Sequence, residues 1–166
     1  MPYYHGSFDA AERGTRWEGR GEAYAQAWAH TDFYAVLERY RPASMRQHAN
    51  SVFMVADVDD IDLAGGATEF CLEVQPEGLV ARHDLNWSTE ISMLISDGKS
   101  PDDPEVMKAA LAYWAGEPHV NESVWEFTAD AFIVLRCEPY ETFDASRVAP
   151  PWNAPEDRGR RRRARR

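Results

Sequence analysis

Apolar residues recur along the chain with two periods, which predict a mixture of strands and helices. The continuous apolar run at 51–56 is typical of a strand buried on both faces. The run at 69–74 alternates, with Glu69 and Glu73 on its polar side, so we expect a half-exposed strand that ends at Pro76. Further strands are predicted at 2–8, 123–127 and 131–137, the last two either adjacent or joined with an irregular step.

Two other segments show the period of a helix. Apolar residues between 21 and 40 recur at intervals of three and four, which predicts one helix, or two helices broken near Thr31, ending before Pro42. A further helix is predicted at 102–116, with Asp103 as its N-cap. The residues expected on the buried faces are Tyr24, Ala27, Trp28, Thr31 and Ala35 in the first segment and Met107, Ala110, Leu111 and Trp114 in the second.

These elements predict an α+β fold built around one hydrophobic core. The chain has 166 residues, of which 44% are apolar and 12% aromatic, enough for a single packed domain. We place this domain at residues 1–148 and expect 149–166 to form a Pro-rich linker and a disordered Arg-rich tail. No stretch approaches the roughly 20 apolar residues of a membrane span, and no secretion signal is visible at the start, so we expect a soluble, cytoplasmic protein without membrane contact.

The charge of the chain is divided between its body and its tail. The net charge is −10, yet seven of the 18 basic residues lie in the last nine positions. Residues 1–157 therefore carry 11 basic and 28 acidic groups, a charge of about −17. Such a body repels bare nucleic acid, whereas the basic tail is a candidate for contact with nucleic-acid phosphates or with an acidic face of the body.

Several common chemistries lack their motifs. The sequence contains no phosphate-binding GxxxxGK[ST] loop, no strand-linked GxGxxG, no GxSxG nucleophile elbow and no HExxH motif. The acidic residues at 57–62 do not place a glycine and a glutamate where a calcium loop requires them. We interpret this cluster as a solvated loop and expect no metal site.

Three short motifs carry the candidate chemistry. They are YYHGS at 3–7, SVFMV at 51–55 and SVWEF at 123–127. In this order they resemble the His-Tyr-Glu class of the ADP-ribosyltransferase superfamily, which contains diphtheria-toxin-like, poly(ADP-ribose)-polymerase-like and rifampin-modifying enzymes. The resemblance spans most of residues 3–137 and implies an ADP-ribosyltransferase-like split β-sandwich with flanking helices around a cleft for NAD.

The resemblance also implies roles for five residues. Glu126 would stabilise the positive charge that develops on the nicotinamide ribose, and His5 would contact a ribose hydroxyl. Gly6 would let its backbone approach the nicotinamide amide, with Ser7 beside it. Phe53 would stack on the nicotinamide ring, where members of the class usually carry tyrosine. The catalytic candidates are therefore Glu126 and His5, and the NAD-binding candidates are His5, Gly6, Ser7 and Phe53.

The same residues also have structural interpretations. His5, beside a glycine, can be a hydrogen-bonded turn residue, Phe53 can belong to the core, and Glu126 can be an outward-facing strand residue. Alternation along the strand would place Glu122 on the same face as Glu126, where it could assist an acceptor nucleophile.

The implied reaction is transfer of ADP-ribose from NAD to an unidentified acceptor, with release of nicotinamide. The acceptor can be a protein, a nucleic acid or a small molecule. Two rival functions stay open. The acidic body can be a non-catalytic binding or inhibitor protein for a basic partner, or the chain can retain the transferase fold as a silent binding module.

Overall fold

The computed structural model describes residues 1–64, 66–119 and 122–152, and these form an α+β structure with two antiparallel sheets. The first sheet has the strand order β1-β4-β7-β2, and the second has the order β3-β6-β5. The strands of the first sheet are β1 (Tyr3–Ser7), β2 (Arg16–Glu18), β4 (Phe70–Glu77) and β7 (Ala131–Pro139). Those of the second are β3 (Val52–Met54), β5 (Ala81–Asp84) and β6 (Trp125–Ala129).

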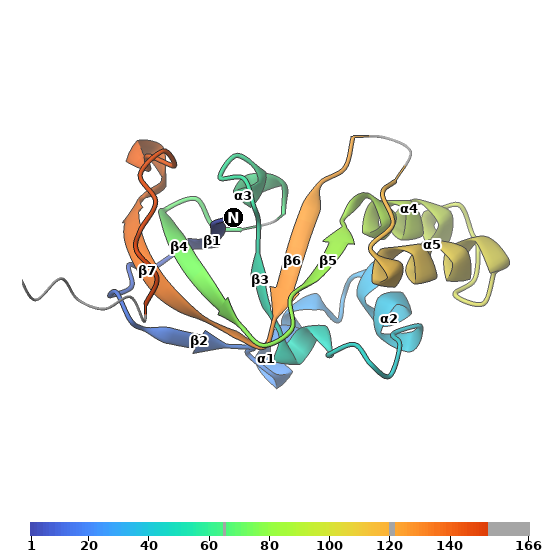
Figure 1. Ribbon diagram of the computed structural model, residues 1–166. Helices are drawn as coiled ribbons and strands as arrows, with labels where there is room; N and C mark the ends of the chain where they lie inside the picture. Colours follow the sequence, from blue (N-terminus) through green and yellow to red (C-terminus); the bar gives the residue numbers. More distant parts are fainter. Residues whose placement is uncertain (65, 120–121, 153–166) are drawn as a thin grey trace, which may run out of the picture.

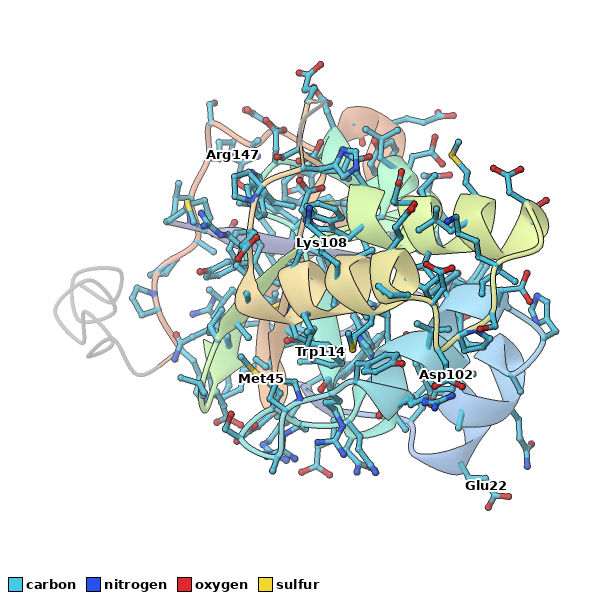
Figure 2. All side chains as sticks on the ribbon, turned by 90° about the vertical axis from the view of Figure 1, so that its right-hand side faces the viewer. Glu22, Met45, Asp102, Lys108, Trp114 and Arg147 are labelled. Atoms are coloured by element: carbon cyan, nitrogen blue, oxygen red, sulfur yellow. The ribbon has the colours of Figure 1, made fainter. Side chains whose placement is uncertain are left out.

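Helices flank the second sheet and one edge of the first (Figure 1). They are α1 (Glu22–Trp28), α2 (Asp32–Arg39), α3 (Asp60–Leu63), α4 (Asn86–Ser96) and α5 (Pro104–Ala115), with 3-10 turns η1 (His48–Asn50) and η2 (Tyr140–Thr142). Helices α2, α4 and α5 gather on the β5 side, and Figure 2 looks onto them, with α4 and α5 side by side. No helix in these parts of the chain is long and apolar enough to cross a membrane.

Two apolar clusters hold these layers together. Residues of both sheets pack between them: Val52, Met54, Leu72, Val74, Phe127, Ala129, Phe132 and Val134. A second cluster joins the helices: Val36, Leu37, Ile91, Val106, Ala109, Ala110, Tyr113 and Trp114. The second sheet therefore has the sheet–sheet core on one face and the helices on the other, so β6 directs alternate side chains into different environments.

The prediction for α5 is right in position and wrong for part of its buried face. Asp103 is the N-cap and accepts a hydrogen bond from the Glu105 N–H at 2.9 Å, as predicted. Met107 and Leu111, however, are 39% and 48% exposed, while Tyr113 is fully buried. The helix is rotated relative to the prediction because the Tyr113 hydroxyl, which a sequence pattern treats as polar, finds hydrogen-bond partners in the interior.

The segment 21–40 forms two helices, which confirms the interpretation with a break near Thr31. Thr31 is the N-cap residue of α2, and its hydroxyl donates to the Trp28 carbonyl at 2.7 Å, which closes the turn between the helices. The predicted common buried face is wrong, because Ala27 and Ala35 are exposed. Helix α2 buries Val36 and Leu37 instead, and α1 has no fully buried residue.

Strand β4 differs from its prediction in two ways. Glu73 is 2% exposed rather than solvated, because Arg136 donates to it at 3.1 Å and the Ala149 N–H donates at 2.8 Å. The strand also continues past Pro76 to Glu77. Strand β1 pairs only with residues 70–74, so Pro76 lies beyond its end, where a missing N–H removes no bond to β1.

The remaining strand predictions are confirmed in outline. β3 is a short edge strand with Phe53 half-buried, rather than a strand buried on both faces. β6 and β7 follow each other, separated by Asp130, but they belong to different sheets.

Beyond residue 148, Trp152 is held to the first sheet by its N–H, which donates to the Gln75 side chain at 3.0 Å. The predicted Arg-rich tail at 158–166 lies outside the described residues.

A candidate ligand-binding and catalytic pocket

The pocket begins where β1 and β3 separate. Tyr4 and Val55 exchange two backbone hydrogen bonds of 2.9 Å, which join the two sheets at this point. One residue further along β1, the backbone pairing stops, and the His5 ring reaches across, with Nδ1 donating to the Phe53 carbonyl at 2.8 Å. The two strands diverge beyond this bond, and a pocket of about 430 Å³ opens between them, a size typical of small-molecule sites.

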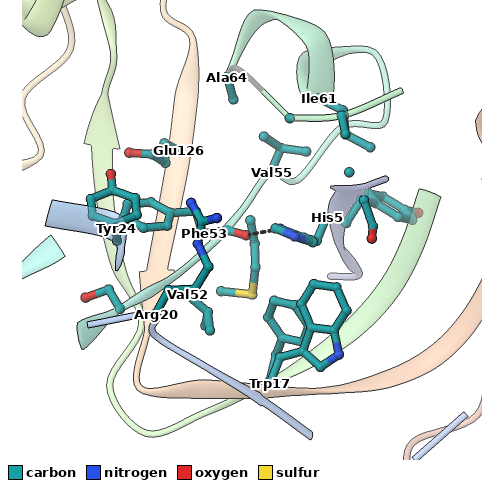
Figure 3. Close-up of a pocket in the computed structure, with 18 of the residues that line it drawn as sticks. His5, Trp17, Arg20, Tyr24, Val52, Phe53, Val55, Ile61, Ala64 and Glu126 are labelled. Carbon is teal, nitrogen blue, oxygen red and sulfur yellow. Dashed lines mark hydrogen bonds between the residues drawn. The ribbon is translucent and has the colours of Figure 1, made fainter. Parts of the chain in front are cut away.

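The pocket collects all five residues predicted to act on NAD. His5, Gly6, Ser7, Phe53 and Glu126 all line it, although they come from three strands that are far apart in the sequence. Figure 3 shows Glu126 beside the Tyr24 ring at one side of the pocket, with His5 at the other side, bonded to the Phe53 carbonyl. The convergence of these residues, which the sequence could not demonstrate, is a property of the fold.

His5 is held in one tautomer. A carbonyl oxygen only accepts hydrogen bonds, so the 2.8 Å contact with Phe53 requires a proton on Nδ1. Burial lowers the pKa of His5, with the Phe53 bond opposing this shift, so the ring is neutral at pH 7 and Nε2 carries a lone pair. Nε2 has no hydrogen-bond partner among the described residues and is not fully buried, and His5 lines the pocket, so Nε2 can serve a ligand as a hydrogen-bond acceptor.

Gly6 presents its backbone to the pocket. Tyr4 directs its N–H and carbonyl toward β3, and residues two apart in a strand point the same way, so those of Gly6 also face the gap. A Cβ atom at Gly6 would lie 2.2 Å from the Ala67 carbonyl oxygen and 2.5 Å from the Ile61 side chain. Close packing on one side therefore requires a glycine. On the other side its N–H and carbonyl groups face the gap, where a ligand could bind them.

Ser7 shapes the turn after β1. Its hydroxyl donates to the Asp9 carbonyl at 2.7 Å and accepts from the Asp9 N–H at 3.1 Å. The hydroxyl hydrogen is thus already used within the protein. Ser7 lines the pocket but offers a ligand at most an acceptor lone pair.

Phe53 lies inside an aromatic stack. The Tyr24 ring is parallel to it at 5.0 Å between centroids, and the His48 ring at 6.0 Å, each with an interplanar angle of 11°. Because both rings are nearly parallel to Phe53, a ligand ring could stack on Phe53 only where these two rings leave its faces open. The pocket-lining ring of α1 that lies beside Phe53 is Tyr24.

Glu126 is a buried carboxyl group at the pocket wall. It is 8% exposed and points toward the helices, while its neighbour Phe127 points into the sheet–sheet core. The Tyr113 hydroxyl lies 3.3 Å from Oε1, within hydrogen-bond distance. Burial raises the pKa of Glu126 to about 8, against the opposing effect of Tyr113. Oε2 has no hydrogen-bond partner among the described residues, and Glu126 lines the pocket.

The expectation for Glu122 is wrong. The strand begins at Trp125, so Glu122 lies before it, exposed and outside the pocket lining. Strand alternation therefore does not place its carboxylate beside that of Glu126.

Sequence reasoning did not identify several other residues that line the pocket. Trp17 of β2 and Tyr24 and Trp28 of α1 add aromatic surface. Arg20 also lines the pocket, and its guanidinium carbon lies 5.9 Å from the centre of the Tyr24 ring. The signal available in the sequence was a glycine-rich stretch at 14–21 that carries Trp17 and Arg20 just before α1.

The arrangement suits a ligand with a sugar, an aromatic ring and an amide. Acceptors at His5 and Glu126 fit hydroxyl groups, the Gly6 peptide fits an amide, and aromatic rings fit a planar heterocycle. Within the described residues no group of three or more His, Cys, Asp or Glu side chains is arranged to hold a metal ion. Comparison of the chain with protein-family models, with curated proteins and with solved structures gave no match.

Proposed function

We propose that the protein is an NAD-dependent ADP-ribosyltransferase that releases nicotinamide and transfers ADP-ribose to a protein, nucleic-acid or small-molecule acceptor. The observation that carries this proposal is that His5, Gly6 and Glu126 line one pocket, at the point where the two sheets separate. The two antiparallel sheets are also consistent with a split β-sandwich of the transferase type.

Recognition of the nicotinamide riboside half would use groups that have no protein partner. The Gly6 N–H and carbonyl would pair with the carboxamide, and Nε2 of His5 would accept from a ribose hydroxyl. Tyr24 would supply aromatic contact to the nicotinamide ring from α1. Arg20, a cation that lines the same pocket, would interact with the diphosphate.

The chemical step would depend on Glu126. Breaking the bond between nicotinamide and ribose creates an oxocarbenium-like centre, which an adjacent carboxylate stabilises. Glu126 lines the pocket, and the low polarity that raises the pKa of this carboxyl group also strengthens its attraction to a cation. In the absence of an acceptor, water would take the ribosyl group, so NAD hydrolysis is the expected side reaction.

Nicotinamide release from NAD tests the proposal directly. Purified protein is incubated with NAD alone and with fractionated cell extract, and free nicotinamide is separated by chromatography. NAD labelled in the adenosine half then shows whether protein, nucleic acid or small molecules retain ADP-ribose. The absence of both NAD binding in calorimetry and nicotinamide release would refute this function, and salt-sensitive binding to a basic partner in the same extract would favour the acidic binding protein instead.

A further inference from the structure

Behind the pocket, four side chains form a buried hydrogen-bonded chain that ends on Glu126. Nδ1 of His48 lies 2.7 Å from Oε1 of Glu38, and Nε2 lies 2.8 Å from the Tyr113 hydroxyl. The same hydroxyl lies 3.3 Å from Oε1 of Glu126. His48 and Tyr113 are 4% and 1% exposed. The chain thus connects α2, η1, α5 and β6 without passing through solvent.

The four side chains need one more hydrogen than His48 and Tyr113 supply to make all three hydrogen bonds between them. Glu38 is a carboxylate: burial opposes its ionisation, but hydrogen bonds from the His48 side chain and backbone N–H hold its pKa below the ordinary value. Nδ1 of His48 therefore donates to it. Two contacts then remain, Nε2 to the hydroxyl and the hydroxyl to Glu126, while Tyr113 supplies one hydrogen. One extra proton completes both contacts, and it can reside on Glu126 or on His48.

We propose, building on the function proposed above, that this chain moves its extra proton between Glu126 and His48 when ligand binds. In the free protein the proton is on Glu126, which donates to Tyr113, which donates to Nε2 of His48. When ligand hydroxyls and a ligand cation reach Glu126, its proton passes to the Tyr113 oxygen, and the Tyr113 hydrogen passes to Nε2. Glu126 becomes a carboxylate and His48 an imidazolium, and no proton enters or leaves the protein.

The count of buried charges decides where the proton resides in the free protein. With the proton on Glu126, the only charge in the chain is Glu38, which also accepts from Arg41 at 3.1 Å. With the proton on His48, the interior holds three charges, including a Glu126 carboxylate with one long hydrogen bond. Separating charge in a buried site is unfavourable unless each charge is well paired. A cationic ligand with hydroxyl groups supplies the pairing that Glu126 lacks.

Other titratable groups lie near the chain without joining it. Tyr24 interacts electrostatically with both Glu126 and Tyr113, Tyr34 lies beside the His48 ring, and Arg20 and His5 line the same pocket as Glu126. His83 stacks on the Tyr113 ring at 4.5 Å, but its hydrogen bonds go to the Tyr113 carbonyl and to Thr128. Burial lowers the pKa of His83 to about 4, so it stays neutral at pH 7. His83 therefore provides an internal control, a buried histidine on the same tyrosine that should not change its charge.

Histidine NMR with a NAD analogue tests the proton movement. Protein labelled with ¹⁵N-histidine is titrated at pH 7 with carbocyclic NAD, whose nicotinamide bond cannot be cleaved in this way. We expect His48 to change from a neutral ring to an imidazolium, with the His83 signals unchanged. Calorimetry in two buffers of different ionisation enthalpy should show no net proton exchange on binding.

Replacing Tyr113 by phenylalanine breaks the chain between His48 and Glu126. In Tyr113→Phe the His48 ring should not change on binding, and carbocyclic NAD should release up to one proton from Glu126 to solvent at pH 7. Tyr34→Phe is the matched control, since it removes a hydroxyl from a ring near His48 that is outside the chain. Glu38→Gln, at a partly exposed position, is a second route: it should keep the proton on Glu126 even with ligand bound.

The results separate the two proposals. A His48 ring that has the same charge with and without bound ligand, or a Tyr113→Phe protein that binds with no proton release, overturns the proton chain while leaving the transferase proposal intact. No binding of carbocyclic NAD overturns the transferase proposal. In that case ¹³C NMR titration of Glu126 in the free protein still tests the chain, because loss of the Tyr113 donor should raise the Glu126 pKa by about one to two units. An unchanged value would refute it.

Discussion

Replacing Glu126 by glutamine tests the chemistry and the energetics of the pocket together. The two side chains have the same shape, and the glutamine carbonyl can still accept from the Tyr113 hydroxyl. The change removes the negative charge that would stabilise the oxocarbenium-like centre. An electrostatic contact of this kind contributes about 3 kcal/mol to the transition state, so we expect turnover of NAD to fall about a hundredfold.

The same substitution should stabilise the fold at alkaline pH. Burial raises the pKa of Glu126 from 4.5 to about 8, a span equivalent to about 5 kcal/mol at about 1.4 kcal/mol per unit. A buried glutamine retains part of the desolvation cost without the charge. We therefore expect Glu126→Gln to raise the free energy of unfolding by about 2–3 kcal/mol above pH 8.

The pH dependence follows from the direction of this shift. Below the ordinary pKa of 4.5, Glu126 is protonated in both the folded and the unfolded chain, so it favours neither state. As pH rises from 4.5 to about 8, the unfolded chain releases the proton and the folded protein retains it. The free energy of unfolding therefore falls across this window. The difference between Glu126→Gln and wild type should thus be near zero at pH 4.5 and largest above pH 8.

Urea unfolding at several pH values and initial rates of nicotinamide release measure the two effects. Glu122→Gln is the matched control, because it makes the same chemical change at an exposed position just before the same strand. It should alter neither quantity appreciably. Turnover within about threefold of wild type in Glu126→Gln would remove this carboxyl group from the mechanism. Equal or lower stability at pH 9 would contradict the argument from burial.

Four further substitutions probe the rest of the pocket. His5→Ala should raise the NAD KM more than it lowers kcat, since a ribose contact made in both the ground and transition states is uniform binding; a pure kcat effect would argue against that role. Arg20→Gln should weaken NAD binding about tenfold by calorimetry with little change in thermal stability, and unchanged affinity would exclude a diphosphate contact. Phe53→Ala should weaken NAD binding and also lower Tm, because the ring is stacked between two others; full retention of both would show that the stack is dispensable. Gly6→Ala should cost about 1–3 kcal/mol of unfolding free energy, because its Cβ would lie 2.2 Å from the Ala67 carbonyl oxygen, and an undisturbed Tm would show that this loop yields easily.

Short stretches of the sequence determine many of the helix ends and strands of this protein. Asp103 caps α5 and Gly116 ends it with a φ of 65°, as neighbouring residues alone could indicate. The positions of β1, β3, β4, β6 and β7 and of the two helices on either side of Thr31 also follow from local periodicity, whereas β2 and β5 were not predicted. These features can be predicted from the sequence because they depend on hydrogen bonds and steric limits between nearby residues.

Burial could not be inferred in the same way, because it depends on partners that are distant in the sequence. Glu73 was expected in solvent and is buried, since Arg136 lies beside it on the neighbouring strand. Leu111 was expected in the core and is half exposed, whereas Tyr113 takes the buried position with its hydroxyl satisfied by His48. A polar side chain becomes a good core residue only when the tertiary structure supplies its hydrogen bond.

The candidate site shows the same division. The sequence motifs singled out His5 and Glu126, but only the fold decided that both line one pocket and fixed the state of each. The Phe53 carbonyl selects the tautomer of His5, and burial raises the pKa of Glu126 to about 8. Protonation is a property of the surroundings, which the chain creates only when β1, β3, β6 and α5 come together.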